Sequence, residues 1–263
     1  MQEAHTDPDP EEVLLLGADA ARIVLESGAE TYRAEETAQA VCSSLGGVEA
    51  ECFATPTGVM LSFFGLDGRV RSIVRRVSSR SMNLERIARI NDLSRKLYAG
   101  QLDFHGAAAE LGRIEQLMGH PPIVSFLAAG AGTGFFTLLF GGRWNDALVS
   151  AIVGAVLSRL TRALTRRRIS DFFTNIVGGM AATLACLLCG KAGLASNPET
   201  AIIGTIMLLV PGVAITNAIR DIIAGDLVAG VARGAEAFIS AAAISIGAGA
   251  AFEAWRFLGG GAL

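Results

Sequence analysis

The sequence predicts an α-helical polytopic membrane protein with about five transmembrane helices and an N-terminal α+β cytosolic domain. Its hydrophobic content of 51%, charged content of 18% and mean hydropathy of +0.46 are too apolar for an ordinary soluble protein. Charge is also unevenly placed, because residues 1–120 hold 18 of the 25 acidic and 12 of the 22 basic residues. Pro121 and Pro122 then stop any helix. We therefore expect a cytosolic domain over 1–120 and a transmembrane domain over 121–263.

The first domain begins with two helices and continues with a small sheet. Apolar residues recur at helical spacing from Val13 to Leu25, and a second helix starts at Thr31 and ends near Leu45. Three short runs separated by turn residues then predict a β-meander over 48–53, 58–64 and 69–77, with one turn at 65–68. Helical spacing returns after Asn83 and again from Asp103 to Met118. The predicted order is helix, helix, strands, helix, helix.

This domain shows none of the sequence patterns of common enzymes. It lacks a G-x-S-x-G elbow, a phosphate-binding loop, an H-E-x-x-H pair and paired Cys-x-x-Cys motifs. His5, His105 and His120 have no ligand spacing, and the four cysteines are scattered. We therefore expect no enzyme activity, no catalytic residue, no cofactor and no metal. The net charge of −3 also argues against a nucleic-acid partner.

A basic run accompanies the third predicted strand and allows two interpretations. Its arginines could meet anionic lipid headgroups of the bilayer, or they could form a solvated strand face paired with acids of the domain. We favour the second. The residues are Arg69, Arg71, Arg75, Arg76 and Arg80.

The second domain supplies stretches of the length that a bilayer core requires, about 20 mainly apolar residues each. Arginines gather in the loop after the second stretch, at Arg162 and 166–168, which places this loop and the N-terminus on the cytoplasmic side. The predicted spans are 123–140, 147–164, 172–188, 200–219 and 231–258.

Small residues crowd these predicted spans at the spacing that lets helix backbones approach each other closely. We interpret them as packing positions. The motifs are Gly130-x-x-x-Gly134, Gly178-Gly179, Gly230-x-x-x-Gly234 and Gly247-x-Gly249.

The fourth span carries the most informative pattern. Pro211 removes a backbone donor and Gly212 loosens the same point, so the helix should kink or unwind there. Asn217 and Asp221 follow four residues apart on one face. Such interrupted helices often line a transport path, which makes these four residues candidates for the path.

Two further candidates open the fifth span, where Arg233 and Glu236 lie three residues apart. An ionisable group inside a membrane is costly unless it is paired or hydrated, which favours a functional role for Glu236. For Asp221 the sequence leaves two alternatives equally open, a functional group in the path or part of a charged loop at the membrane edge.

In these residues the chain resembles the bacterial threonine/serine exporter family, most closely its split form with a longer subunit and a small membrane subunit. The resemblance covers nearly the whole chain in order, and its most specific part runs from the Pro-Gly pair through Asn217 and Asp221 to Arg233. The matching segments are Gly28-Ala-Glu30, Gly141-Gly-Arg-Trp-Asn-Asp-Ala147, Leu208-Leu-Val-Pro-Gly212, Asn217-Ala218, Asp221, Gly225 and Gly230-Val-Ala-Arg233.

The resemblance implies a multi-pass protein of the bacterial plasma membrane that exports threonine and serine, or dicarboxylates such as succinate. It also implies a small multi-pass partner subunit, because single-chain members carry about twice as many spans. A homo-oligomer is compatible with it. The competing hypothesis is a membrane-anchored sensor or scaffold whose cytosolic domain binds a ligand or protein.

Overall fold

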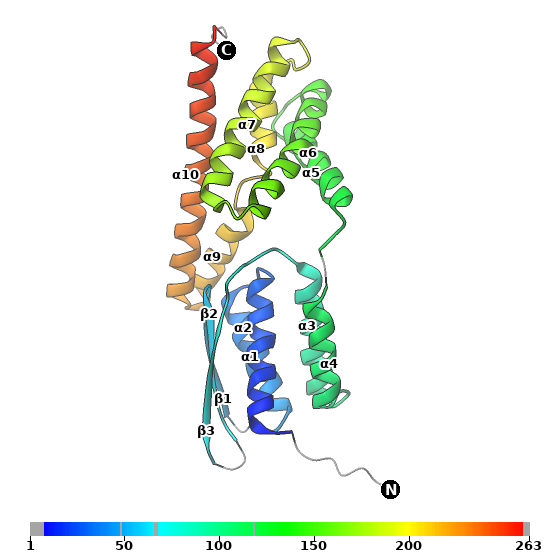
Figure 1. The fold of residues 1–263 in the computed structure, drawn as a ribbon, viewed down its shortest axis with the longest axis vertical. Helices are drawn as coiled ribbons and strands as arrows, with labels where there is room; N and C mark the ends of the chain where they lie inside the picture. Colours follow the sequence, from blue (N-terminus) through cyan, green and yellow to red (C-terminus); the bar gives the residue numbers. More distant parts are fainter. Residues whose placement is uncertain (1–7, 48, 66–67, 118, 260–263) are drawn as a thin grey trace. The chain divides into compact units, whose positions relative to one another are not determined.

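The chain forms two compact units in the computed structural model, which describes residues 8–47, 49–65, 68–117 and 119–259. One unit comprises Met1–Gly119 together with Ile215–Gly234. The other comprises His120–Ala214 together with Ala235–Leu263. Figure 1 gives the order of the elements along the chain.

The first unit begins with an antiparallel pair of helices, α1 (Pro10–Glu26) and α2 (Thr31–Ser44). The carboxylate of Asp9 accepts a hydrogen bond from the N–H of Glu11, and Pro10 suits the first helical position. Gly28 follows α1 with a φ of +84°, a conformation that favours glycine. The chain therefore reverses within four residues and enters α2.

A three-stranded antiparallel sheet packs on these two helices (Figure 1). Its strands are β1 (Glu49–Thr55), β2 (Gly58–Phe64) and β3 (Val70–Arg76), in the order β1-β2-β3. Alternation places Val59 and Leu61 in the core, both 0% exposed, whereas Met60 between them is exposed. Met60 pairs in register with Phe53 and Val74, which are exposed on the same face.

Two more helices, α3 (Leu84–Tyr98) and α4 (Phe104–Glu115), complete the core of the first unit. Each starts at a side-chain cap: Asn83 accepts from the N–H of Arg86, and Asp103 accepts from the N–H of Gly106. The predicted α+β order is thus confirmed. Four of the predicted positions lie outside the described residues: the start of the first strand at 48, the end of the last helix at 118, residues 66–67 of the predicted turn, and His5.

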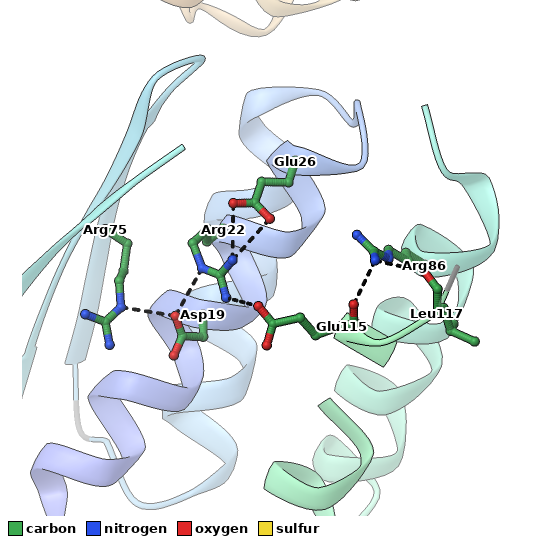
Figure 2. A network of polar contacts seen from close by, with 7 residues as sticks. All are labelled: Asp19, Arg22, Glu26, Arg75, Arg86, Glu115 and Leu117. Carbon is green, nitrogen blue, oxygen red and sulfur yellow. Dashed lines mark hydrogen bonds and ion pairs between the residues drawn. The ribbon is translucent and has the colours of Figure 1, made fainter. Parts of the chain in front are cut away.

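A network of ionic contacts ties α1 to its neighbours (Figure 2). The guanidinium of Arg22 bonds Asp19 and Glu26 on its own helix and reaches Glu115 at the end of α4, 2.7 Å away. Asp19 also accepts a hydrogen bond from Nε of Arg75 in β3 at 3.1 Å. This arginine of the basic run is therefore paired with an acid of its own unit, as the second interpretation of the run expects.

All regular secondary structure among the described residues of the second unit is helical. It contains α5 (Pro122–Leu139), α6 (Trp144–Arg166), α7 (Asp171–Lys191) and α8 (Pro198–Ile206), together with Gly212–Ala214 of α9 and residues 235–257 of α10. Four helices of the described chain are long and apolar enough to cross a membrane: α5, α6, α7 and α10 (Leu227–Phe257). This agrees with a multi-pass membrane protein.

The predicted fourth span is broken. Helix α8 ends at Ile206, residues 207–211 form turns and a non-helical link, and α9 (Gly212–Ala224) then begins. Neither part has the length of a bilayer span, so the candidate spans number four instead of the five long stretches that hydropathy predicts. The interruption expected at Pro211 and Gly212 is confirmed, and its cause is the donor that proline lacks.

The helices of the second unit approach one another closely at glycines and are joined by hydrogen bonds of buried hydroxyl groups. Gly179 of α7 lies so close to α10 that a Cβ atom there would stand 2.5 Å from the carbonyl oxygen of Ile244. Between α5, α6 and α8, the hydroxyl of Ser150 donates to the carbonyl oxygen of Thr133 at 3.1 Å. The same hydroxyl lies 3.0 Å from the hydroxyl of Thr205. The packing interpretation is confirmed for Gly130, Gly134, Gly178, Gly179, Gly230 and Gly247, which closely approach other segments, but it is wrong for Gly234 and Gly249, where a Cβ atom would meet nothing within 4 Å.

One loop of this unit is held by a buried carboxylate. Asp146 at the start of α6 is 0% exposed and accepts the N–H of Arg143 at 2.9 Å. Its other oxygen accepts the N–H of Asn197, which caps α8, also at 2.9 Å. The Gly-Gly-Arg-Trp-Asn-Asp segment therefore joins the starts of two helices.

Candidate functional site

Three of the predicted path residues meet within the first unit. Asn217 and Asp221 share one face of α9, as their spacing of four predicts, and Arg233 comes from the second turn of α10. All three are buried, with exposures of 6%, 0% and 4%. Burial of a charged residue is costly unless it is paired, so the partners of these side chains decide what they do.

The amide and guanidinium groups bind the loop between α1 and α2. Nδ2 of Asn217 donates to the carbonyl oxygen of Gly28 at 2.8 Å. Nη2 of Arg233 donates to the next carbonyl oxygen, that of Ala29, also at 2.8 Å. We call residues 28–31 the α1–α2 loop.

Asp221 binds the end of the same loop, where α2 starts. Its Oδ1 accepts the N–H of Thr31 at 3.0 Å, and its Oδ2 lies 3.3 Å from the donating hydroxyl of Thr31. Among the described residues, Glu30 at the N-cap offers α2 no side-chain cap of its own, so Asp221 caps the helix from a distant part of the chain. The Nε of Arg233 completes an ion pair with Asp221 at 3.1 Å.

A second ion pair lies beside this one, at its exposed edge. Glu30, only 4% exposed, accepts a hydrogen bond from Arg220 of α9 and lies 3.5 Å from Arg33. Burial alone would raise the pKa of Glu30. Its own backbone N–H and the two arginines outweigh burial, so its pKa lies below the usual value.

Two further carboxylates face the site from α2 and from the link between α9 and α10. Glu35 accepts the N–H of Ala54 in β1 at 2.7 Å. Burial raises the pKa of Glu35, and the negative charges of Asp226 and Asp221 raise it further. The pKa of Asp226 is raised by burial and by Asp221. The site thus combines three arginines with four acids.

The raised pKa of Glu35 predicts a specific dependence of stability on pH. A carboxyl group whose pKa is raised on folding contributes its stability at low pH and loses it as pH rises through the folded-state pKa. Glu35→Gln keeps an oxygen for the N–H of Ala54 but carries no charge. We therefore expect the variant to gain unfolding temperature relative to the wild type between about pH 4 and pH 7.

Thermal unfolding of the purified chain across that pH range checks this expectation. Glu36→Gln is the matched control, because Glu36 is the exposed neighbour on α2. A wild-type advantage that grows with pH would contradict the assignment. Glu30, whose pKa is lowered, acts in the opposite sense in both proteins and so cancels in the comparison.

The remaining predicted residues stand elsewhere. Pro211 and Gly212 mark the interruption between α8 and α9. Glu236 lies on α10 with an exposed side chain and belongs to the second unit, whereas Arg233 belongs to the first.

Sequence reasoning missed the α1–α2 loop as the partner of these residues. Gly28-Ala-Glu30 stood out only as a matching triplet, and Thr31 only as a helix start. The useful signal was a glutamate instead of Ser, Thr, Asp or Asn at the N-cap position of α2, since a helix start without its own cap needs a partner from elsewhere.

The donors and acceptors of the site suit the binding of polar organic groups. In the part of the chain that the structure describes, no group of three or more His, Cys, Asp or Glu could hold a metal ion. Asn217 and Arg233 present donors to oxygen atoms, and Asp221 presents acceptors to N–H and O–H groups.

The threonine/serine exporter family model matches residues 16–255, nearly the whole chain. This chain belongs to the threonine/serine exporter family. The match includes the α1–α2 loop, the interrupted segment between α8 and α9, and all six predicted path residues.

Individual relatives differ in the length that they share with this exporter-family chain. A "Probable threonine/serine exporter" of Mycobacterium tuberculosis is 27% identical over 89% of the chain, and a "Threonine/serine exporter" of Corynebacterium glutamicum is 26% identical over 90%. The chain spans only 45% and 50% of these two proteins. A "Probable succinate transporter subunit" of Klebsiella aerogenes is 25% identical, with 90% of the chain and 91% of the relative covered. No solved structure matches the chain.

Proposed function

We propose that this chain is the larger subunit of a secondary membrane transporter that exports small polar metabolites, threonine and serine or dicarboxylates such as succinate. The single observation that carries the proposal is the buried trio Asn217, Asp221 and Arg233, which follows an interrupted helix in a chain with four apolar helices. Interrupted helices with polar side chains beyond the break suit substrate binding in transporters.

The proposed topology places the chain in the bacterial plasma membrane. Residues 1–120 form the cytoplasmic domain and 121–263 the membrane domain, with α8 and α9 serving as a fifth, interrupted crossing. The basic end of α6 at Arg166 supports a cytoplasmic position for that loop and for the N-terminus. Full-length similarity to a relative named as a subunit supports assembly with a small multi-pass partner.

Each polar residue has a proposed role in transport. Asn217 hydrogen-bonds the substrate, and Arg233 neutralises its carboxylate. Glu236 or Asp221 carries the coupling proton.

Export from proteoliposomes that contain the chain and its partner subunit tests these roles. We expect Asn217→Ala to lower threonine, serine or succinate flux at least about tenfold, since it removes a positioned donor from the path. Ser245→Ala is the control, because this exposed hydroxyl donates only to Ala241 of its own helix. Wild-type flux in the Asn217→Ala variant would refute the role of Asn217. If the wild-type protein exported none of the three substrates, a sensor or scaffold would be favoured.

A further inference from the structure

Asp221 binds one residue of its own chain through two groups on adjacent carbons. In Thr31 the backbone nitrogen is attached to Cα, and the side-chain hydroxyl is attached to the neighbouring Cβ. The nitrogen lies 3.0 Å from Oδ1 of Asp221 and the hydroxyl 3.3 Å from Oδ2. Both oxygens of one buried carboxylate are therefore used by the vicinal N–H and O–H donors of a threonine.

The same pair of donors exists in a free β-hydroxy amino acid. Threonine and serine carry an ammonium group on Cα and a hydroxyl on Cβ. The ammonium group is charged, so its bond to a carboxylate is stronger than the neutral amide N–H bond that Thr31 makes. A free amino acid also carries a carboxylate, and Asn217 and Arg233 direct their donors at carbonyl oxygens of the same loop.

We propose that Asp221 determines specificity by binding the vicinal amino and hydroxyl groups of a β-hydroxy amino acid, and that Thr31 occupies this position as an internal mimic. This inference rests on the proposed function and deepens it. The α1–α2 loop then competes with the substrate for three side chains. The loop has to leave Asp221, Asn217 and Arg233 before a substrate can bind them.

The charge of Asp221 also separates the two substrate classes of the family's relatives. A dicarboxylate has neither donor, and a carboxylate placed at the position of Thr31 would meet a second negative charge. A site that offers acceptors to N–H and O–H groups rejects a ligand that lacks them, because the buried acceptors then stay unbonded. Asp221 therefore favours threonine and serine over succinate.

Competition by the loop has a measurable consequence. When only a fraction of the protein has the site open, the apparent dissociation constant equals the intrinsic one divided by that fraction. Thr31→Val keeps the shape and the backbone N–H that donates to Asp221, but it loses the hydroxyl bond. We expect it to bind L-threonine about threefold to tenfold more tightly than the wild type, which corresponds to the usual strength of one such bond. Thr31→Ser keeps the hydroxyl and should bind as the wild type does.

Calorimetric titration of the full chain in nanodiscs tests the proposal with L-threonine, L-valine and succinate. L-valine has the shape of threonine without the hydroxyl, so the wild type should bind it more weakly, and succinate should also bind more weakly than threonine. Asp221→Leu, whose side chain has no polar atom, should abolish the preference for threonine over valine. If Thr31→Val does not fold, Thr31→Ala carries the same expectation.

Unchanged or weaker threonine binding in a folded Thr31→Val variant would overturn the proposal. So would a preference for threonine over valine that survives Asp221→Leu in the folded protein. These results are separate from the flux assay: threonine export with no effect of Thr31→Val refutes the internal mimic alone. Tighter binding without export of any substrate refutes the transport function alone.

Discussion

Replacing Asp221 by alanine is expected to lower the stability of the first unit by about 3–5 kcal/mol, the usual cost of breaking a buried ion pair. The variant leaves the guanidinium of Arg233, which is 4% exposed, without its carboxylate partner. It also removes the acceptor at the start of α2, where Thr31 donates two hydrogen bonds. Both losses occur where water cannot replace the missing partner.

Thermal unfolding in detergent and hydrogen exchange at the start of α2 measure this effect. Arg89→Gln is the control, because both side chains of the Arg89–Glu85 pair are 52% exposed and the pair should contribute little. The double variant Asp221→Leu with Arg233→Met removes both charges and should recover part of the stability. Equal stability of Asp221→Ala and the wild type would contradict the burial of this pair.

Gly247→Ala is expected to destabilise the second unit by about 2–3 kcal/mol, in the range of overpacked cores. A Cβ atom at this position of α10 would collide with the backbone carbonyl of Ile176 in α7, which cannot move without shifting its helix. Fluorescence-detected gel filtration and thermal unfolding of the purified chain report the loss of folded protein.

Gly249→Ala provides a matched control two residues further along α10. A Cβ atom at Gly249 meets nothing within 4 Å. Alanine favours helix more than glycine does, so this variant should be neutral or more stable by up to about 1 kcal/mol. The same loss in both variants would indicate a general intolerance of α10 to alanine, and the close approach to α7 would then be wrong.

Local patterns were sufficient for most of the fold. Short runs between turn residues marked the strands of the first unit, and helical spacing after Asn83 and from Asp103 marked two of its helices, because turns and helical periodicity are local features. Hydropathy was less reliable for counting spans. It joined α8 and α9 into one stretch, since composition does not register the backbone donor that Pro211 lacks.

The sequence predicted the site residues of α9 and α10 but not the residues that they contact. Spacing placed Asn217 and Asp221 on one face, and the cost of an ionisable group inside a membrane made Asp221 and Glu236 candidates. Their partners lie about 190 to 204 positions away in the sequence, at Gly28, Ala29 and Thr31. No periodic pattern links residues at that distance, because such contacts depend on how the two segments fold against each other.

The sequence by itself determined the apolar, low-charge character of the chain after His120, the α+β order before it, and the weak point at Pro211. Those features follow from hydrophobicity, helical and strand periodicity, and the chemistry of proline, which are properties of short segments. Only the tertiary structure decided that Asp221 caps a distant helix and pairs with Arg233, and that Gly247 is closely packed whereas Gly249 is not. These distinctions depend on which surfaces meet, and two glycines of one motif differ solely in what lies opposite them.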